Sequence, residues 1–226
     1  MRSSALVFCL LWPLFGHADE VTRQIVVTGT GVVSAAPDMA IIRLGVAREA
    51  RTASVAMDAT SDAAARVLES IAAAGIEARD VQTSVVNLSP VWDHASGRPP
   101  QLRGYIASNG LTVRVRDLEG LGGLLDAVVS DGANTLNGLS FSVDETGPLE
   151  AHARTEAVLD AKAKAETLAA AGGVTLGPVL QINEAGGGVT PAPMLRGAMM
   201  EAAPVPIAEG EVDIRISVTV VYGIAE

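Results

Sequence analysis

Residues 24–49, QIVVTGTGVVSAAPDMAIIRLGVARE, decide the fold class of this chain. Two runs rich in isoleucine and valine, Gln24 to Val33 and Asp38 to Glu49, predict β-strands, and the turn-like segment 34–37 separates them. Because the link is short, we expect the two strands to pair as a hairpin. The chain therefore opens with strand pairing and not with a strand–helix–strand unit.

Two long segments further along the chain have helical periodicity. Between Thr52 and Ala74, small and apolar residues recur three and four positions apart, and Gly75 supplies a C-terminal stop. Pro148 suits the first turn of an alanine-rich helix that ends at Gly172-Gly173. A stripe made mostly of alanine lets the helix backbone approach its sheet closely. The stripe consists of Leu149, Ala153, Ala157, Ala161, Ala165 and Leu168.

The remaining elements complete an α+β order. A short helix capped by Asp117 is predicted to end near Asp131-Gly132. Further strands are predicted over Val81 to Trp92, Arg103 to Arg116, Leu136 to Asp144, Leu176 to Ile182 and Val212 to Tyr222. The order ββαββαβαββ favours one domain over residues 19–226, with a largely antiparallel sheet packed with about three helices. A glycine- and proline-rich stretch at about 183–210 is predicted to be a long flexible loop.

The first 18 residues have the features of a cleaved secretion signal. Arg2 precedes an apolar run of about 11 residues, and Gly16-His17-Ala18 places small residues at a cleavage site. We expect a periplasmic mature chain that begins at Asp19. The run is shorter than the roughly 20 apolar residues that span a bilayer, so no transmembrane helix is predicted. Cleavage also removes Cys9, the only cysteine, which suits an oxidising compartment.

Composition excludes one class of partner. The formal net charge is −10, so nucleic acid and anionic lipid surfaces would repel the chain. Aromatic residues make up 3 % of the sequence, too few for platforms on which bases stack. We therefore predict no nucleic-acid partner.

No local pattern supplies a catalytic mechanism. Gly29-Thr30-Gly31 follows a strand, but Ser34 holds the third glycine position of a dinucleotide motif and another strand follows, so a bulge or a close backbone contact is the favoured interpretation. No Gly-x-Ser-x-Gly elbow occurs, and an envelope hydrolase would need a triad that brings His94 or His152 to a distant serine. We predict a non-enzymatic protein without catalytic residues or a cofactor, and keep the hydrolase as an alternative.

Three methionines define the candidate metal site. Met194, Met199 and Met200 lie in the predicted long loop, and their thioether sulfurs suit Cu(I). Flexible methionines more often pack on a neighbouring surface or face solvent. A periplasmic ligand or Cu(I) binder is therefore the second alternative, beside the prediction that the chain holds no metal.

Several segments together resemble the bacterial SIMPL domain family, formerly a domain of unknown function (DUF541). They agree with that family in order and spacing from about Arg23 to Gly223. The segments are Val27-Thr28-Gly29-Thr30-Gly31, Pro37-Asp38-Met39-Ala40, Gly75-Ile76, Asp80-Val81-Gln82-Thr83, Gly104-Tyr105-Ile106-Ala107-Ser108-Asn109, Asp131-Gly132-Ala133-Asn134, Leu139-Ser140-Phe141-Ser142-Val143, Ala153-Arg154, Asp160-Ala161-Lys162-Ala163-Lys164-Ala165 and Gly172-Gly173.

The resemblance implies an exported envelope protein, similar to periplasmic immunogenic proteins and to an oxidative-stress-associated periplasmic protein. Its relatives form ring-like or channel-like homo-oligomers, so we expect self-association and a role in envelope integrity or oxidative-stress tolerance. Other envelope partners stay open. We interpret the motifs structurally: 131–134 as a turn, Gly104-Tyr105 and Asn109 as sites of strand irregularity, and Arg154, Asp160 and Lys164 as pairing within the helix or across a subunit contact.

Overall fold

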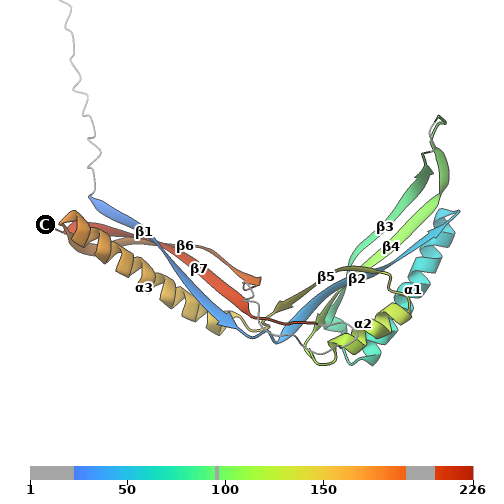
Figure 1. Cartoon of the computed structure of the whole chain (residues 1–226), viewed down its shortest axis with the longest axis horizontal. Helices are drawn as coiled ribbons and strands as arrows, with labels where there is room; N and C mark the ends of the chain where they lie inside the picture. Colours follow the sequence, from blue (N-terminus) through green and yellow to red (C-terminus); the bar gives the residue numbers. More distant parts are fainter. Residues whose placement is uncertain (1–22, 95–96, 192–206, 226) are drawn as a thin grey trace, which may run out of the picture.

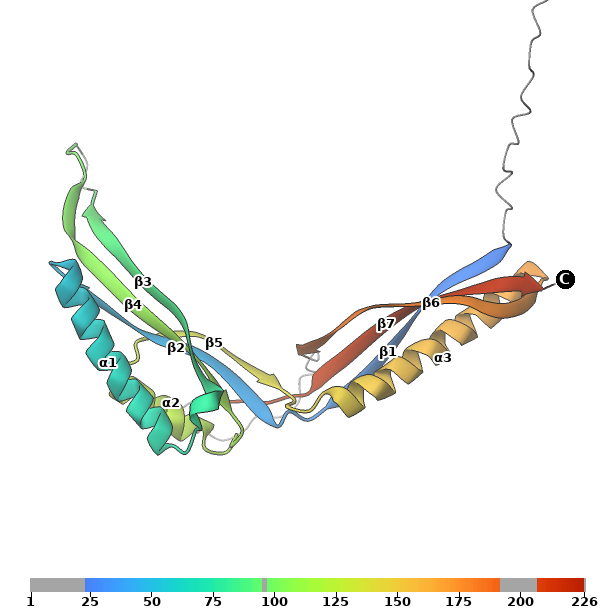
Figure 2. The same ribbon diagram turned by 180° about the vertical axis from the view of Figure 1, so that it is seen from behind.

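The structure, a computed structural model, describes residues 23–94, 97–191 and 207–225. Figures 1 and 2 show two elongated lobes that meet at an angle, each made of an antiparallel sheet with one helix or two on one face. The α+β class and the order ββαββαβαββ predicted from the sequence are confirmed. Each lobe has its own hydrophobic core.

The three-stranded lobe joins the two ends of the chain. Its strands are β1 (Gln24–Ala35), β7 (Val212–Ala225) and β6 (Thr175–Pro191), in the order β1-β7-β6. Helix α3 (Gly147–Gly172) lies along one face of β1 and β7. Alternate residues of β7 turn toward this helix and are buried: Val212, Ile214, Ile216, Val218, Val220 and Tyr222.

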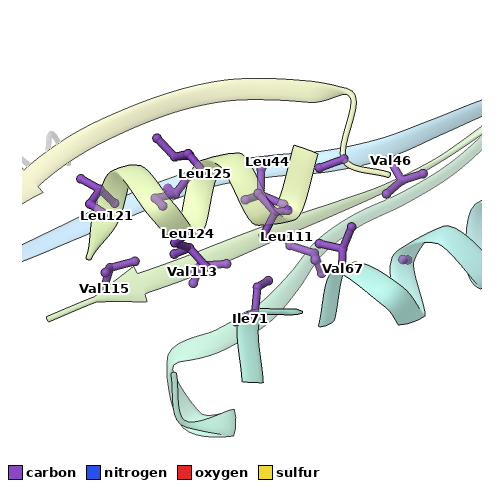
Figure 3. Close-up of a cluster of buried hydrophobic side chains, with 14 of the residues drawn as sticks. Leu44, Val46, Val67, Ile71, Leu111, Val113, Val115, Leu121, Leu124 and Leu125 are labelled. Atoms are coloured by element: carbon purple, nitrogen blue, oxygen red, sulfur yellow. The ribbon is translucent and has the colours of Figure 1, made fainter. Parts of the chain in front are cut away.

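The four-stranded lobe holds the middle of the chain. Its strands are β2 (Met39–Ala50), β3 (Val81–Asp93), β4 (Gln101–Val115) and β5 (Thr135–Ser142), in the order β3-β4-β2-β5. Helices α1 (Ala53–Ala73) and α2 (Leu121–Ser130) cover one face, and a short 3₁₀ turn, η1 (Ala78–Asp80), precedes β3. Figure 3 shows the core between them, where Leu44, Leu111 and Val113 meet Val67, Ile71 and Leu124.

Polar contacts brace the junction of the lobes. The backbone N–H of Asp38, just before β2, donates to the carbonyl of Ser142 at 3.2 Å, and the Asp38 carboxylate accepts from the N–H of Asp144 at 2.8 Å. Arg116 donates to Asp144 at 2.6 Å and to the buried carboxylate of Asp80 at 3.1 Å. The two chain crossings at 36–38 and 143–146 are therefore tied to each other and to the end of β4.

The predicted hairpin of the first two strands is wrong. β1 pairs along its whole length with β7, from Gln24 opposite Gly223 to Ala35 opposite Val212, while β2 pairs with β4 and β5. The link 36–38 carries no glycine or asparagine that would favour the left-handed backbone of a tight hairpin turn. It therefore leads the chain from one sheet into the other.

Several element bounds differ from the prediction. β6 continues to Pro191, so the stretch predicted to be a loop from residue 183 is strand for its first part. Helix α2 begins at Leu121 with Gly120 at its N-cap, so the predicted cap by Asp117 is wrong; the Asp117 carboxylate accepts the N–H of Gly120 in a turn before the helix. In α3, Ala169 continues the buried stripe, whereas the predicted Leu168 is 53 % exposed. The four-residue spacing from Ala153 to Ala165 reaches Ala169 and misses Leu168.

The contact between α3 and β1 explains the motif Gly29-Thr30-Gly31. A Cβ on Gly29 would lie 1.9 Å from the carbonyl oxygen of Ala157, and a Cβ on Gly31 would lie 1.9 Å from that of Ala153. Helix backbone therefore rests directly on strand backbone. This confirms a close contact, one of the two possibilities for these glycines, and it confirms the role of the alanine stripe.

We predict that Gly29→Ala lowers the free energy of unfolding by about 1–3 kcal/mol, because the added methyl meets helix backbone that cannot move aside. Gly122→Ala is the control, since a Cβ there meets nothing within 4 Å and alanine favours helix by up to about 1 kcal/mol. Urea titrations followed by circular dichroism measure both. Equal stability of Gly29→Ala and the wild type would contradict the close contact.

Candidate interaction surfaces

The outer edge of β1 is occupied by two side chains of α3. β1 is an end strand of its sheet, so half of its backbone groups face away from β7. The carboxylate of Asp160 accepts the N–H of Thr30 at 2.8 Å, and the ammonium of Lys164 donates to the carbonyl of Thr28 at 3.0 Å. Lys164 also donates to Asp160 at 2.7 Å. We call Asp160 and Lys164 the β1 edge cap.

The edge cap depends on the glycine contact. Because the α3 backbone lies directly on Gly29 and Gly31, side chains one position off the buried stripe reach over the strand edge. The hydrogen bonds from Lys164 and from the backbone of Thr30 lower the pKa of Asp160 below its usual value. A second extended chain could therefore pair with β1 at this point only after displacing the Asp160 carboxylate and the Lys164 ammonium.

An ion pair holds the opposite side of α3. Arg154 donates to both carboxylate oxygens of Glu184 on β6, at 2.7 and 3.0 Å. This hydrogen bonding from the guanidinium lowers the pKa of Glu184 and raises that of Arg154. The side chains of α3 are thus bound to both outer strands of the three-stranded sheet.

The predicted pairing within α3 is confirmed for Asp160 and Lys164, whose carboxylate and ammonium lie 2.7 Å apart, and both side chains also contact β1. Lys162 and Glu166 form a second pair four residues apart, at 3.8 Å, and both are exposed. Arg154 contacts β6 of its own chain, so its contact lies neither within the helix nor in a subunit interface.

The segment 131–134 forms the predicted turn between α2 and β5, and it also binds β2. The side chain of Asn134 accepts the N–H of Ala47 at 2.8 Å and donates to the carbonyl of the same residue at 2.9 Å. The guanidinium of Arg48 donates to the carbonyl of Gly132 at 3.0 Å. The side chain of Asn134, the residue just before β5, thereby forms with Ala47 the two hydrogen bonds that the backbone of a strand residue would form.

The hairpin of β3 and β4 projects beyond the rest of its sheet (Figures 1 and 2). Its register shifts once between Val91 and Trp92, beside Gly104, where irregularity was predicted, and once between Thr83 and Val85, opposite Leu111 and Gly110. Asn109, the other predicted position, pairs regularly with Val86 and with Val46. Helix α1 packs chiefly on β4 and β2 and leaves β3 largely uncovered. Large apolar side chains are therefore exposed on the hairpin: Val85, Val86, Leu88, Trp92, Leu102 and Ile106.

The structure assembles none of the catalytic alternatives within the residues it describes. His94 and His152 are both exposed, and His152 lies 3.7 Å from Glu156, four residues along α3. No hydrogen bond in the described ranges joins either histidine to a serine. Across those ranges no three or more histidine, cysteine, aspartate or glutamate residues form a cluster that could hold a metal ion. The candidate copper ligands Met194, Met199 and Met200 lie outside the described residues.

Within residues 23–94, 97–191 and 207–225, no helix combines the length and the apolar character needed to cross a bilayer.

The glycine contact, edge cap and Asn134 turn coincide with the motifs that resemble a known family, and a profile comparison identifies it. Residues 25–222 match the SIMPL family, described as a protein of unknown function (DUF541). The chain belongs to the SIMPL family. The match begins in β1 and ends in β7, so it covers elements of both lobes.

Individual relatives are similar over nearly the whole chain. The chain is 42 % identical to a "26 kDa periplasmic immunogenic protein" of Brucella melitensis, over 97 % of this chain and 93 % of that protein. It is 31 % identical to the "Uncharacterized protein YggE" of Edwardsiella ictaluri, over 83 % of this chain and 79 % of that protein. Its identity to the protein of the same name in Escherichia coli K12 is 29 %, with coverages of 92 % and 87 %. None of these names describes an enzyme.

We predict that replacing both Asp160 and Lys164 by alanine makes the chain associate more strongly with itself, because the N–H of Thr30 and the carbonyl of Thr28 lose their partners. The matched control is the double alanine variant of Lys162 and Glu166, an exposed pair on the same helix. Light scattering over a concentration series measures the change. Equal masses for the two double variants would contradict the role of the edge cap.

Acid is predicted to weaken the contacts of α3. The folded-state pKa values of Asp160 and Glu184 are lowered from usual values of 3.8 and 4.5, so their contribution to stability is present above these values and is lost as pH falls through the folded pKa. The double variant Asp160→Asn, Glu184→Gln should lose less stability than the wild type as pH falls below 4.5. Urea midpoints at a series of pH values test this, and parallel curves would contradict it.

Proposed function

We propose that this protein is exported, has a mature chain that begins at Asp19, and acts in the periplasm as a non-enzymatic protein that self-associates through its β3–β4 hairpin. Its role is to support envelope integrity or oxidative-stress tolerance. The export features at residues 1–18 and the printed name of the Brucella relatives support the location. We propose that residues 19–226 act as one functional unit in spite of the two cores.

The exposed apolar surface of the hairpin is the observation that carries this proposal. Val85 is 53 % exposed, Val86 is 55 % exposed and Trp92 is 47 % exposed. Val86 and Leu88 lie in register with Asn109 and Ala107, on the sheet face that α1 covers over the neighbouring strands. Val85 pairs with Gly110 and lies on the opposite face, so the hairpin exposes apolar side chains on both of its faces. Exposed apolar surface of this kind on an exported protein supports a contact with another macromolecule.

The strand edges support the choice of the hairpin as the contact. β3, like β1, is an end strand and offers unpaired backbone groups along one side. In the described part of the chain, no side chain binds the β3 backbone as Asp160 and Lys164 bind that of β1. A second copy can therefore contribute both strand pairing and apolar burial at β3, whereas the edge cap opposes such pairing at β1.

The proposal of a non-enzymatic role rests on the polar motif residues of the chain. The polar motifs of the family form hydrogen bonds that hold the fold, as Asn134 does with Ala47 and Asp160 does with Thr30. These hydrogen bonds give the motif residues a structural role, which supports the proposal. The names of the relatives support this reading because none of them denotes an activity.

Self-association is tested on the purified mature chain by light scattering. The variant Val86→Thr, Leu88→Thr keeps residues that favour strands but removes apolar contact area, so we expect its apparent dissociation constant to rise at least about tenfold. Leu159→Gln, at an exposed position of α3, is the control. A monomeric wild type, or equal masses for the hairpin variant and the wild type, would contradict the proposal.

The envelope role is tested in a host strain that lacks the gene. Restoring the wild-type chain should recover survival in peroxide and resistance to detergent, whereas the hairpin variant, at the same periplasmic level, should not. Full recovery by the hairpin variant would separate the role from self-association, and unchanged survival of the deletion strain would contradict the role itself.

A further inference from the structure

A pocket with an apolar lining opens between α2 and β5, away from the hairpin. Its volume is about 610 Å³. Leu44 of β2 lies at its base, Leu125, Val128 and Val129 of α2 form one wall, and Leu136 of β5 forms the other. Leu44 and Leu125 can be located in Figure 3, at the upper side of α2.

The local backbone keeps the pocket open. Leu136 pairs in register with Leu44 and therefore lies on the same sheet face. The register then shifts, so that Gly138 is the residue that pairs with Arg43. Gly138 has a positive φ of 155°. Val129 is 64 % exposed and Leu136 is 61 % exposed, so α2 and β5 do not close on each other. Two large apolar side chains are left facing one space.

The residues that line the pocket favour a ligand whose larger part is apolar. Volumes of about 300–1,000 Å³ with mostly hydrophobic walls are typical of sites for small molecules. The amide of Asn134, a polar group of the lining, already uses its oxygen and its nitrogen in hydrogen bonds with Ala47. Hydroxyls of Ser130 and Thr135 are the other uncharged polar groups on the wall. A ligand with many polar groups would lose hydrogen bonds to water without replacing them.

One carboxylate in the lining determines which ligand charge the pocket favours. Asp126 is the one ionisable residue among those that line the pocket, and it is exposed. Within the described ranges no cationic side chain forms an ion pair with it. The chain as a whole carries a formal net charge of −10, which favours the approach of cations over that of anions.

We propose that the pocket between α2 and β5 binds a cationic amphiphile, with an alkyl chain between Val129 and Leu136 and a positively charged end beside Asp126. This ligand site is separate from the proposed self-association surface. Two other hollows fit less well. The cavity of about 180 Å³ beside Asp80 is lined by charged groups that include the paired Arg116, and the one of about 400 Å³ beside Lys164 adjoins the edge cap.

The experiment uses the full mature chain and two probes, dodecyltrimethylammonium and dodecanoate, below their critical micelle concentrations in isothermal titration calorimetry. We expect the cation to bind more tightly than the anion by at least about fivefold. The variant Val129→Ser, Leu136→Ser should weaken cation binding at least about tenfold, because it removes apolar contacts from both walls. Both positions are exposed, so folding is preserved.

Two further variants separate charge from shape. Asp126→Asn should leave dodecanoate binding equal or stronger and bring the two affinities together. Leu159→Gln, an exposed change on α3, should alter neither affinity. The hairpin variant Val86→Thr, Leu88→Thr should keep the cation affinity even where its mass falls, which distinguishes failure of this site from failure of the proposed function.

Three results would overturn the site. Tighter binding of dodecanoate would show that an anionic amphiphile is the ligand. Equal cation binding by the wild type and the Val129→Ser, Leu136→Ser variant would place binding elsewhere. Absence of binding to either probe would also overturn the site. If the Val129→Ser, Leu136→Ser variant then has a smaller particle mass than the wild type, a second copy of the chain covers the pocket.

Discussion

The structure of the three-stranded lobe depends on the direct contact between the backbone of α3 and the backbone of β1. Gly29 and Gly31 leave no side chain between them, and alanines on the helix leave almost none. Such an interface buries little area per residue, but it freezes few side-chain rotamers. It also fixes the height of α3 above the sheet, and that height lets Asp160 and Lys164 reach the strand edge.

The occupied edge has consequences for assembly. A chain with two open sheets carries four end strands, and each is a place where another copy could pair. The edge cap removes part of β1 from this set, while the apolar hairpin of β3 and β4 remains available. In the self-association that we propose, pairing through the β3 edge alone would yield a defined particle and not an unlimited aggregate. The pocket between α2 and β5 lies outside both features and can therefore serve a separate ligand.

Local signals in the sequence predicted the elements well and their pairing poorly. Pro148 and Gly173 marked the ends of α3 because caps are local features, and Gly173 is in the left-handed region with a φ of 67°. The pairing of β1 with β7 joins opposite ends of the chain, so adjacency along the sequence gave the wrong partner. Asp160 and Lys164 have the spacing of an ordinary helix pair, and only the docking of α3 gives them a strand edge to bind. The pocket depends on how α2 and β5 sit in space, which no motif encodes.

Amide hydrogen exchange at Thr30, resolved to single residues, tests the central claim most directly. The N–H of Thr30 faces away from β7 and donates to Asp160, whereas the N–H of Val32, two residues further along the same edge, has no such acceptor among the described side chains. The account predicts slow exchange at Thr30, fast exchange at Val32, and loss of the difference in Asp160→Ala. Equally fast exchange at both residues in the wild type would contradict an edge held by α3.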